Sequence, residues 1–309
     1  MIIHTPSFNE NHQIEDFVNQ IAVQTKSPQK IVLHDDASND STVQTFQKAC
    51  LAQGIQHQIH ISPRNTGLVR NLRKLLITAS SQDQIFALLS NHEKFQDNHL
   101  AVLEEGIMAD PSLALCYSDS YFRSSDSNEL FPEYSAPDLD TVGLDRVESF
   151  TKVLKNYTVS NALWGSYRPS HVSMSSPFPF GRGGDHAFLA GIALTGPIRF
   201  IKQQTWTRIR ERHRSYLHFA TLENCYREKG EIEEVSKWPW LGFWQSHYEV
   251  LCNSAISNSE KVECIRRSVH LCQQKSSGKF LEEINLMLTL KKGPVSMWLT
   301  AKLIDGILN

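Results

Sequence analysis

The first 120 or so residues alternate between short apolar runs and longer stretches of helical period, and this alternation restricts the fold more than any other feature. Strands are expected at 1–4, 30–34, 58–61, 85–89 and 113–117. Helices are expected between them, at 12–25, 38–53, 68–79 and 100–108. Because consecutive strands joined through helices run parallel, the pattern predicts an α/β/α sandwich with a mostly parallel sheet covered on both faces.

The second part of the chain has a different pattern of apolar and polar residues. From residue 214 onward the pattern is nearly continuously helical, with interruptions at Pro239 and at Gly293-Pro294. We therefore expect an α/β domain over 1–213 and a helical C-terminal extension over 214–309.

Two segments have open interpretations. The stretch 124–144 is rich in Ser, Asp, Pro and Glu and is predicted to be a mobile loop over one edge of the sheet, or a solvated connection. The end of the chain, 293–309, has the pattern of an amphipathic helix that packs on the helices before it. Peripheral contact with a membrane surface is the alternative, although Lys302 supplies the only positive side chain there.

Composition excludes several classes of protein. The net charge of -2, with no concentrated basic face, argues against a nucleic-acid partner. The six cysteines form no CxxC pair, which is typical of unpaired thiols in a reducing compartment. No signal peptide and no apolar run of about 18 residues are visible in the sequence, so we expect a soluble cytoplasmic protein, or one held peripherally at the inner face of the membrane.

A polar cluster follows each expected strand. The clusters are "HTPSFNEN", "HDDASNDST", "SPRNTG", "SNHEKF" and "SDSYF". In open α/β sheets, ligands bind outside the carboxyl ends of the strands. The five clusters therefore predict a binding site along one rim of the sheet.

The cluster "HDDASNDST" places carboxylates beside the start of a helix. Asp36 is suited to accept hydrogen bonds from a nucleobase N–H and a ribose hydroxyl. The alternative is that Asp40 or Ser41 caps the helix while Asp35 and Asp36 are solvated. The residue types by themselves favour neither interpretation.

In order and spacing, these segments resemble family 2 glycosyltransferases of the GT-A fold over roughly 1–213. "IIHTPSFNEN" resembles the family's opening strand and loop, and "IVLHDDASNDST" is similar to its "DDGSTDGT" signature. "SPRNTGLVRNLRKLL" resembles the following Asn-x-Gly and Asn-bearing helix, and "CYSDSYF" and "WGSYRPS" also have counterparts. Gly184-Asp185 followed by Ala187-Phe188-Leu189 looks like the family's "ED-x-x-L" element.

The resemblance implies an inverting glycosyltransferase that moves a sugar from a UDP-, GDP- or dTDP-linked donor to a hydroxyl of a glycan or lipid-linked acceptor. Polysaccharide or O-antigen biosynthesis is the common setting of such chains. Asp185 matches the family's catalytic base, with a helix N-cap as the structural alternative. The implied nucleotide-sugar pocket consists of Thr5, Pro6, Phe8, Asp36, Ser38, Asn65, Gly67 and Arg70.

The family's metal-binding DxD element falls on Ser90–Glu93, where its carboxylates are largely replaced. His92 takes the usual ligand position, Glu93 is the carboxylate that remains, and His213 of "RIRERHR" is a candidate third ligand. The implied cofactor is a divalent cation, Mn²⁺ or Mg²⁺, and imidazole suits Mn²⁺ better. The alternative is a site without metal, in a protein that binds a nucleotide or glycan without turnover.

Further side chains have two readings each. The arginines of "RIRERHR" either compensate the charge of the leaving diphosphate or form a solvated segment. Trp164 either faces the acceptor sugar or lies in the core.

Overall fold

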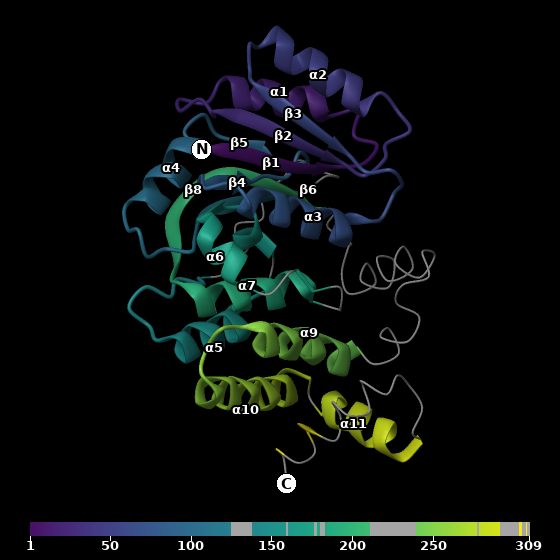
Figure 1. Ribbon diagram of the computed structural model, residues 1–309, viewed down its shortest axis with the longest axis vertical. Helices are drawn as coiled ribbons and strands as arrows, with labels where there is room; N and C mark the ends of the chain where they lie inside the picture. The colour runs from purple at the N-terminus through teal and green to yellow at the C-terminus, as the bar shows by residue number, and fades with distance from the viewer. Residues whose placement is uncertain are drawn as a thin grey trace.

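The structure is a computed structural model of the 309-residue chain. It describes residues 1–124, 138–158, 160–175, 178–179, 183–210, 239–276, 278–290, 303–304 and 307. The described residues form a mixed sheet with helices on both faces, and further helices pack below one face (Figure 1). The predicted α/β/α arrangement and the helical C-terminal part are confirmed.

Eight strands form the sheet in the order β3-β2-β1-β4-β7-β6-β8-β5. The strands are β1 (Ile2–Ser7), β2 (Lys30–Asp35), β3 (His57–Ile61), β4 (Phe86–Leu88), β5 (Lys94–Phe95), β6 (Leu115–Ser124), β7 (Ser166–Tyr167) and β8 (Ile198–Arg210). The first four are parallel to one another, β7 runs antiparallel between β4 and β6, and β8 is parallel to β6. The carboxyl ends of β1 to β4 therefore share one rim.

The sheet separates two apolar clusters, because alternate residues of each strand point to opposite faces. In β1, Ile3 packs with α1 (Ile14–Ala22), α2 (Thr42–Ala52) and α4 (His99–Met108). On the other face, Ile2 shares a cluster with side chains of α3 (Leu68–Ser80), α5 (Arg146–Asn156), α6 (Pro169–Met174) and α7 (Gly184–Thr195).

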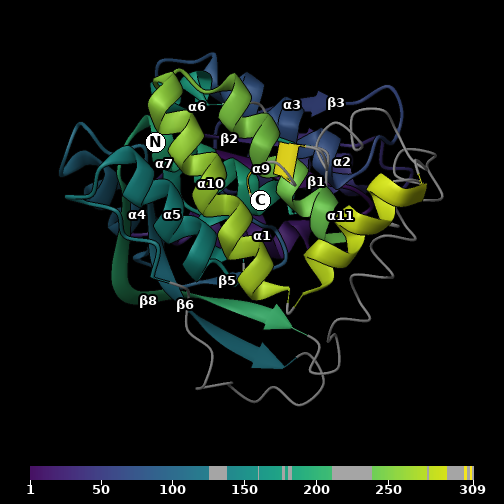
Figure 2. The ribbon, with the colours of Figure 1, turned by 90° about the horizontal axis from the view of Figure 1, so that it is seen from below.

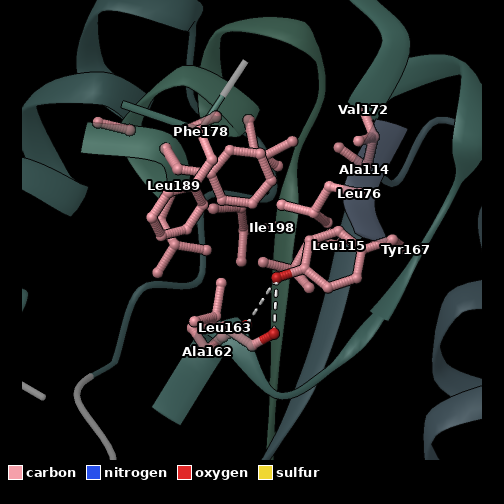
Figure 3. Packing of buried hydrophobic residues seen from close by; sticks show 14 of the residues in the cluster. Leu76, Ala114, Leu115, Ala162, Leu163, Tyr167, Val172, Phe178, Leu189 and Ile198 are labelled. Atoms are coloured by element: carbon pink, nitrogen blue, oxygen red, sulfur yellow. Dashed lines mark hydrogen bonds between the residues drawn. The ribbon is translucent and has the colours of Figure 1, made fainter. Parts of the chain in front are cut away.

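The second cluster is continuous from the sheet to α7. Figure 3 shows Leu115 and Tyr167 of the sheet beside Phe178 and Leu189. The Tyr167 hydroxyl donates to the carbonyl oxygen of Leu163, at 2.8 Å, at the end of the short helix η1 (Ser160–Leu163). The buried phenol is thus satisfied within the core.

Each of the nine elements expected before residue 120 is present, with ends that differ by a few residues. The prediction for "SDSYF" is wrong, because these residues lie inside β6 rather than after it. The strand continues because it pairs with β8 as far as Ser124, with irregular register around Asp119. The two strands project as a ribbon from the body of the sheet (Figure 2).

Three C-terminal helices, α9 (Pro239–Asn253), α10 (Asn258–Lys275) and α11 (Lys279–Leu290), follow the sheet. Seen from below, α9 and α10 lie side by side across α7 and α5 (Figure 2). Leu251, Ile256 and Cys264 belong to the same apolar cluster as the sheet residues. These helices therefore extend the core of the α/β part.

Several expectations fall on residues that the structure does not describe. The boundary at 213/214 lies in such a stretch and stays a prediction, as does most of the terminal helix at 293–309. Of the segment 124–144, only the two ends are described. Five cysteines are described, and all five are free thiols. Within the described helices, none combines the length and apolarity needed to cross a bilayer.

Candidate functional site

Asp35 and Asp36, at the carboxyl end of β2, hold two different loops. Successive residues of a strand point to opposite faces, so the two carboxylates diverge. Asp35 accepts hydrogen bonds from the backbone N–H of Ser38, at 2.9 Å, and from its Oγ, at 2.5 Å. Asp36 accepts from the backbone N–H of Thr66, at 2.9 Å, and of Gly67, at 2.6 Å.

This geometry joins three residues of the predicted donor pocket. Asp36 is 2% exposed and faces the turn that precedes α3. In that turn, Asn65 Oδ1 also accepts from the Gly67 N–H, at 3.0 Å, and Gly67 has a φ of 87°. The alternative in which Asp35 and Asp36 are solvated is wrong, since both carboxylates are buried and hydrogen-bonded.

The loop after β1 is fixed to the loop after β2. The Asn9 N–H donates to Ser38 Oγ, at 2.8 Å, and the Glu10 N–H donates to Thr42 Oγ1, at 2.7 Å. Phe8 directly precedes these contacts in the chain and is 40% exposed, so its ring is accessible to a ligand.

The predicted pocket residues near the rim differ in burial, as Thr5, Pro6 and Arg70 show. Thr5 and Pro6 are buried in β1, and the Pro6 carbonyl accepts from Asn91 Nδ2, at 3.4 Å. Arg70 lies in the first turn of α3 and is partly buried. The structure therefore places Thr5 beneath the rim, whereas Phe8 and Arg70 lie nearer its surface.

The altered DxD element joins the loop after β4 to the loop after β1. His92 Nε2 lies 2.9 Å from Glu10 Oε1, and His92 Nδ1 lies 2.6 Å from Gln13 Nε2. The hydrogen bond to Glu10 raises the pKa of His92 above its ordinary value, against the opposing effect of burial. Glu93 is buried, with Oε1 3.9 Å from Arg208 Nε.

A divalent cation does not fit the part of this element that the structure describes. Both ring nitrogens of His92 face polar side chains of the β1 loop, and Glu93 faces a guanidinium. Across the described ranges, no three His, Cys, Asp or Glu side chains converge as metal ligands would. His213, the predicted third ligand, lies outside the described residues.

Arg208 of β8 contacts the short helix η1 and the loop after β4. Its Nη1 donates to Asn161 Oδ1 in η1, at 2.9 Å, and Asn161 Nδ2 donates to Ser120 Oγ in β6, at 2.5 Å. Together with Glu93 after β4, these contacts form a polar junction. Sequence reasoning missed Asn161, because no local pattern indicates that η1 lies beside β8. Trp164 is partly buried and packs against the larger apolar cluster.

Asp185 lies in the first turn of α7. Its Oδ1 accepts from the His186 N–H, at 2.9 Å, and its Oδ2 accepts from the Tyr157 hydroxyl. The helix is preceded by Gly183, which has a φ of 67° and is the N-cap residue, so the N-cap reading of Asp185 is wrong. A carboxylate in the first turn is also favoured by the helix dipole.

Contacts connect the strand-end loops to η1, and η1 packs on α7. Ser38 holds the β1 loop, and Glu10 of that loop holds His92. Glu93 then faces Arg208, whose partner Asn161 is four residues beyond Tyr157. The strand-end loops and η1 thus form one connected polar region, and α7, whose first turn carries Asp185, packs beside η1.

Comparison with known proteins agrees with this arrangement. The model of the family described as Glycosyl transferase family 2 matches residues 2–167, more than half of the chain. No curated protein matches the chain in sequence.

Solved structures share the fold at low sequence identity. S. aureus TarS 1–349 has 14% identity and a TM-score of 0.60, covering 97% of this chain and 78% of that one. Its complex with UDP-GlcNAc has 12% identity and a TM-score of 0.61, with 92% and 79% coverage. The mannosyltransferase PcManGT from Pyrobaculum calidifontis, with GDP-Man and Mn²⁺, has 14% identity and a TM-score of 0.56, with 99% and 78% coverage. By its sequence match and its fold, the chain belongs to glycosyl transferase family 2 and is a glycosyltransferase of the GT-A fold.

Proposed function

We propose that this glycosyltransferase inverts the anomeric centre of a nucleoside-diphosphate sugar. The acceptor oxygen attacks the anomeric carbon, the bond from that carbon to the diphosphate oxygen breaks, and the acceptor proton passes to Asp185. The observation that carries the proposal is the Asp185 carboxylate, which lies in the first turn of α7. Helix α7 packs on η1, whose Asn161 accepts from Arg208.

The donor pocket is proposed at the ends of β1, β2 and β3. Phe8 would present its accessible ring to the nucleobase, and Arg70, in the first turn of α3, would donate charge-assisted bonds to the diphosphate. Asp36 orders the turn that carries Asn65 and Gly67, so its effect on the donor passes through that turn. Ser38 and the buried Thr5 and Pro6 support the same loops.

The leaving diphosphate needs compensation of its charge. Besides Arg70, Arg208 would provide positive charge, and its guanidinium is already oriented by Asn161 and Glu93. PcManGT was crystallised with Mn²⁺. In this chain, His92 and Glu93 would need further ligands to hold Mn²⁺ or Mg²⁺, and no step of the proposed reaction depends on them.

We extend the proposal to the chemical classes of the donor and the acceptor. TarS has been crystallised with UDP-GlcNAc and PcManGT with GDP-Man, which supports trials of UDP-, GDP- and dTDP-linked sugars. A hydroxyl of a glycan or lipid-linked acceptor is proposed, in polysaccharide or O-antigen assembly at the cytoplasmic face of a membrane. The family resemblance is the support for this setting.

Asp185→Asn tests the reaction. Donor binding is measured by calorimetry with UDP-GlcNAc, GDP-Man and a dTDP-sugar, and release of nucleoside diphosphate is measured with a panel of glycan acceptors. Transfer should be lost in Asp185→Asn with donor affinity nearly intact, whereas the exposed control Asp16→Asn should behave as the wild type. An equally active Asp185→Asn would remove the base assignment. Donor binding without any release in the wild type would favour a protein that binds without turnover.

The dependence of transfer on a divalent metal ion is tested in the same assay. If His92 holds a cation, His92→Ala should abolish any dependence of transfer on added Mn²⁺. A variant that keeps the dependence would place the metal elsewhere, and a wild type without Mn²⁺ dependence would agree with charge compensation by Arg208.

A further inference from the structure

The Tyr157 hydroxyl is directed at the carboxylate proposed as the catalytic base. Tyr157 follows the last residue of α5, and its hydroxyl donates to Asp185 Oδ2. The other oxygen, Oδ1, accepts from the His186 N–H, at 2.9 Å. A carboxylate has about four lone-pair sites. These two contacts therefore fix its orientation and leave capacity for the proton of an acceptor hydroxyl.

A buried histidine pair lies behind Tyr157. The rings of Tyr157 and His186 meet edge to face, with centroids 4.5 Å apart and planes at 90°. His186 Nδ1 lies 2.5 Å from Nε2 of His247 in α9, and His247 Nδ1 lies 2.8 Å from the Phe243 carbonyl oxygen. Because a carbonyl only accepts, His247 carries its proton on Nδ1, and its Nε2 accepts from His186.

The same helix, α9, packs closely against α7. A Cβ added at Gly183 would come within 2.5 Å of the Phe243 ring, and one added at Gly191 within 2.6 Å of Val250 Cγ1. Side chains of α9 therefore occupy the space that a Cβ at either glycine would need. A shift of α9 would consequently move the turn that carries Asp185.

We propose that Tyr157 is a positioning residue for the Asp185 carboxylate, and that α9 holds this pair in place through His247. The proposal rests on the role of Asp185 in the proposed function. It assigns the C-terminal helices a part in the reaction itself, because the Tyr157 ring packs on His186, and His186 contacts His247 of α9. A base that is fixed by a second group reaches the acceptor proton without reorganisation.

Tyr157→Phe is the direct test. The variant keeps the ring that packs on His186 and loses only the hydroxyl. The turnover number kcat should fall about tenfold or more, the usual effect of one lost hydrogen bond to a charged group. The KM for the donor should stay within about twofold, and the pH profile of kcat should differ from that of the wild type, because the profile reports on the hydrogen bonds of the reacting groups.

Tyr248→Phe is the matched control. Tyr248 lies in α9 next to His247, but its ring stacks on Trp244 rather than near Asp185. Loss of the Tyr248 hydroxyl should leave kcat, the donor KM and the pH profile unchanged. Thermal unfolding of both variants should match the wild type.

A second pair of variants tests the contribution of α9. His247→Leu removes the acceptor for His186 Nδ1, whereas His247→Gln retains an oxygen that can accept. We expect kcat to be lower in His247→Leu than in His247→Gln, at equal donor affinity. Equal kcat values in these two variants would overturn the role of α9.

Failure of this inference is distinct from failure of the proposed function. An inactive Asp185→Asn together with a Tyr157→Phe of unchanged kcat and pH profile overturns the positioning role and leaves the base in place. A Tyr157→Phe in which kcat and donor affinity fall together indicates a general structural role and also overturns it. An active Asp185→Asn overturns the proposed function itself.

Discussion

His92 Nε2 lies 2.9 Å from Glu10 Oε1, and this contact ties the loop after β4 to the loop after β1. At the position to which the resemblance assigns a DxD element, an imidazole faces a carboxylate of the protein. The two loops are therefore held together by the chain's own charges.

The first prediction concerns this pair. Glu10→Gln should lower the pKa of His92, because the hydrogen bond to Glu10 is the largest cause of its elevation. Titration of the imidazole by NMR measures the change. Glu15→Gln, an exposed change in α1, should leave the His92 titration unaltered. An unchanged pKa in Glu10→Gln would mean that the contact does not persist in solution.

The second prediction concerns the buried carboxylate after β2. Asp36→Ala should lower the free energy of unfolding by about 3 kcal/mol, because it removes the acceptor for the Thr66 and Gly67 N–H groups. Donor affinity should also fall, since the turn before α3 loses its anchor. Urea unfolding and calorimetry measure the two effects.

Asp40→Ala is the control for this change. Asp40 accepts from the Thr42 N–H at the exposed start of α2, so its loss should cost about 1 kcal/mol and leave donor affinity unchanged. A stable Asp36→Ala with wild-type donor affinity would exclude Asp36 from both roles.

The third prediction concerns acid stability. Burial is the largest cause of the lowered pKa values of four histidines, to about 3 for His4, about 2 for His34, about 3 for His99 and about 4 for His247. The unfolded chain, with histidine pKa values near 6.5, binds protons that the folded protein does not. The free energy of unfolding should therefore be constant above about pH 7 and fall as the pH decreases below about 6.5.

Urea unfolding at several pH values between 7.5 and 5 measures this slope. His99→Gln should reduce it by up to about 1.4 kcal/mol per pH unit, the contribution of one proton, while the exposed His270→Gln should not. Equal slopes in all three proteins would show that His99 is protonated in the folded state.

The fourth prediction compares two glycines with the same backbone conformation. Gly54 and Gly183 have φ values of 66° and 67°, and a Cβ at Gly54 meets nothing within 4 Å. Gly54→Ala should cost about 1 kcal/mol for the left-handed backbone alone. Gly183→Ala should cost more and lower transfer, because its Cβ would clash with Phe243 beside Asp185. If Gly54→Ala and Gly183→Ala lose equal stability in a thermal melt, close packing of α9 against Gly183 is contradicted.

The sequence by itself determined the first four strands, their helices and the polar rim at their ends. These features are local, because the hydrophobic period of each segment already indicates which face is buried. The motifs "HDDASNDST" and "SPRNTG" also indicated two loops that meet, as the contacts of Asp36 confirm.

Only the tertiary structure decided the remaining features. β6 continues to Ser124 because β8, about 80 residues later in the chain, pairs with it. The contacts of Tyr157 with Asp185 and of His186 with His247 join residues 28 and 61 positions apart. No periodicity encodes such pairs, since the packing of α5 and of α9 on α7 creates them.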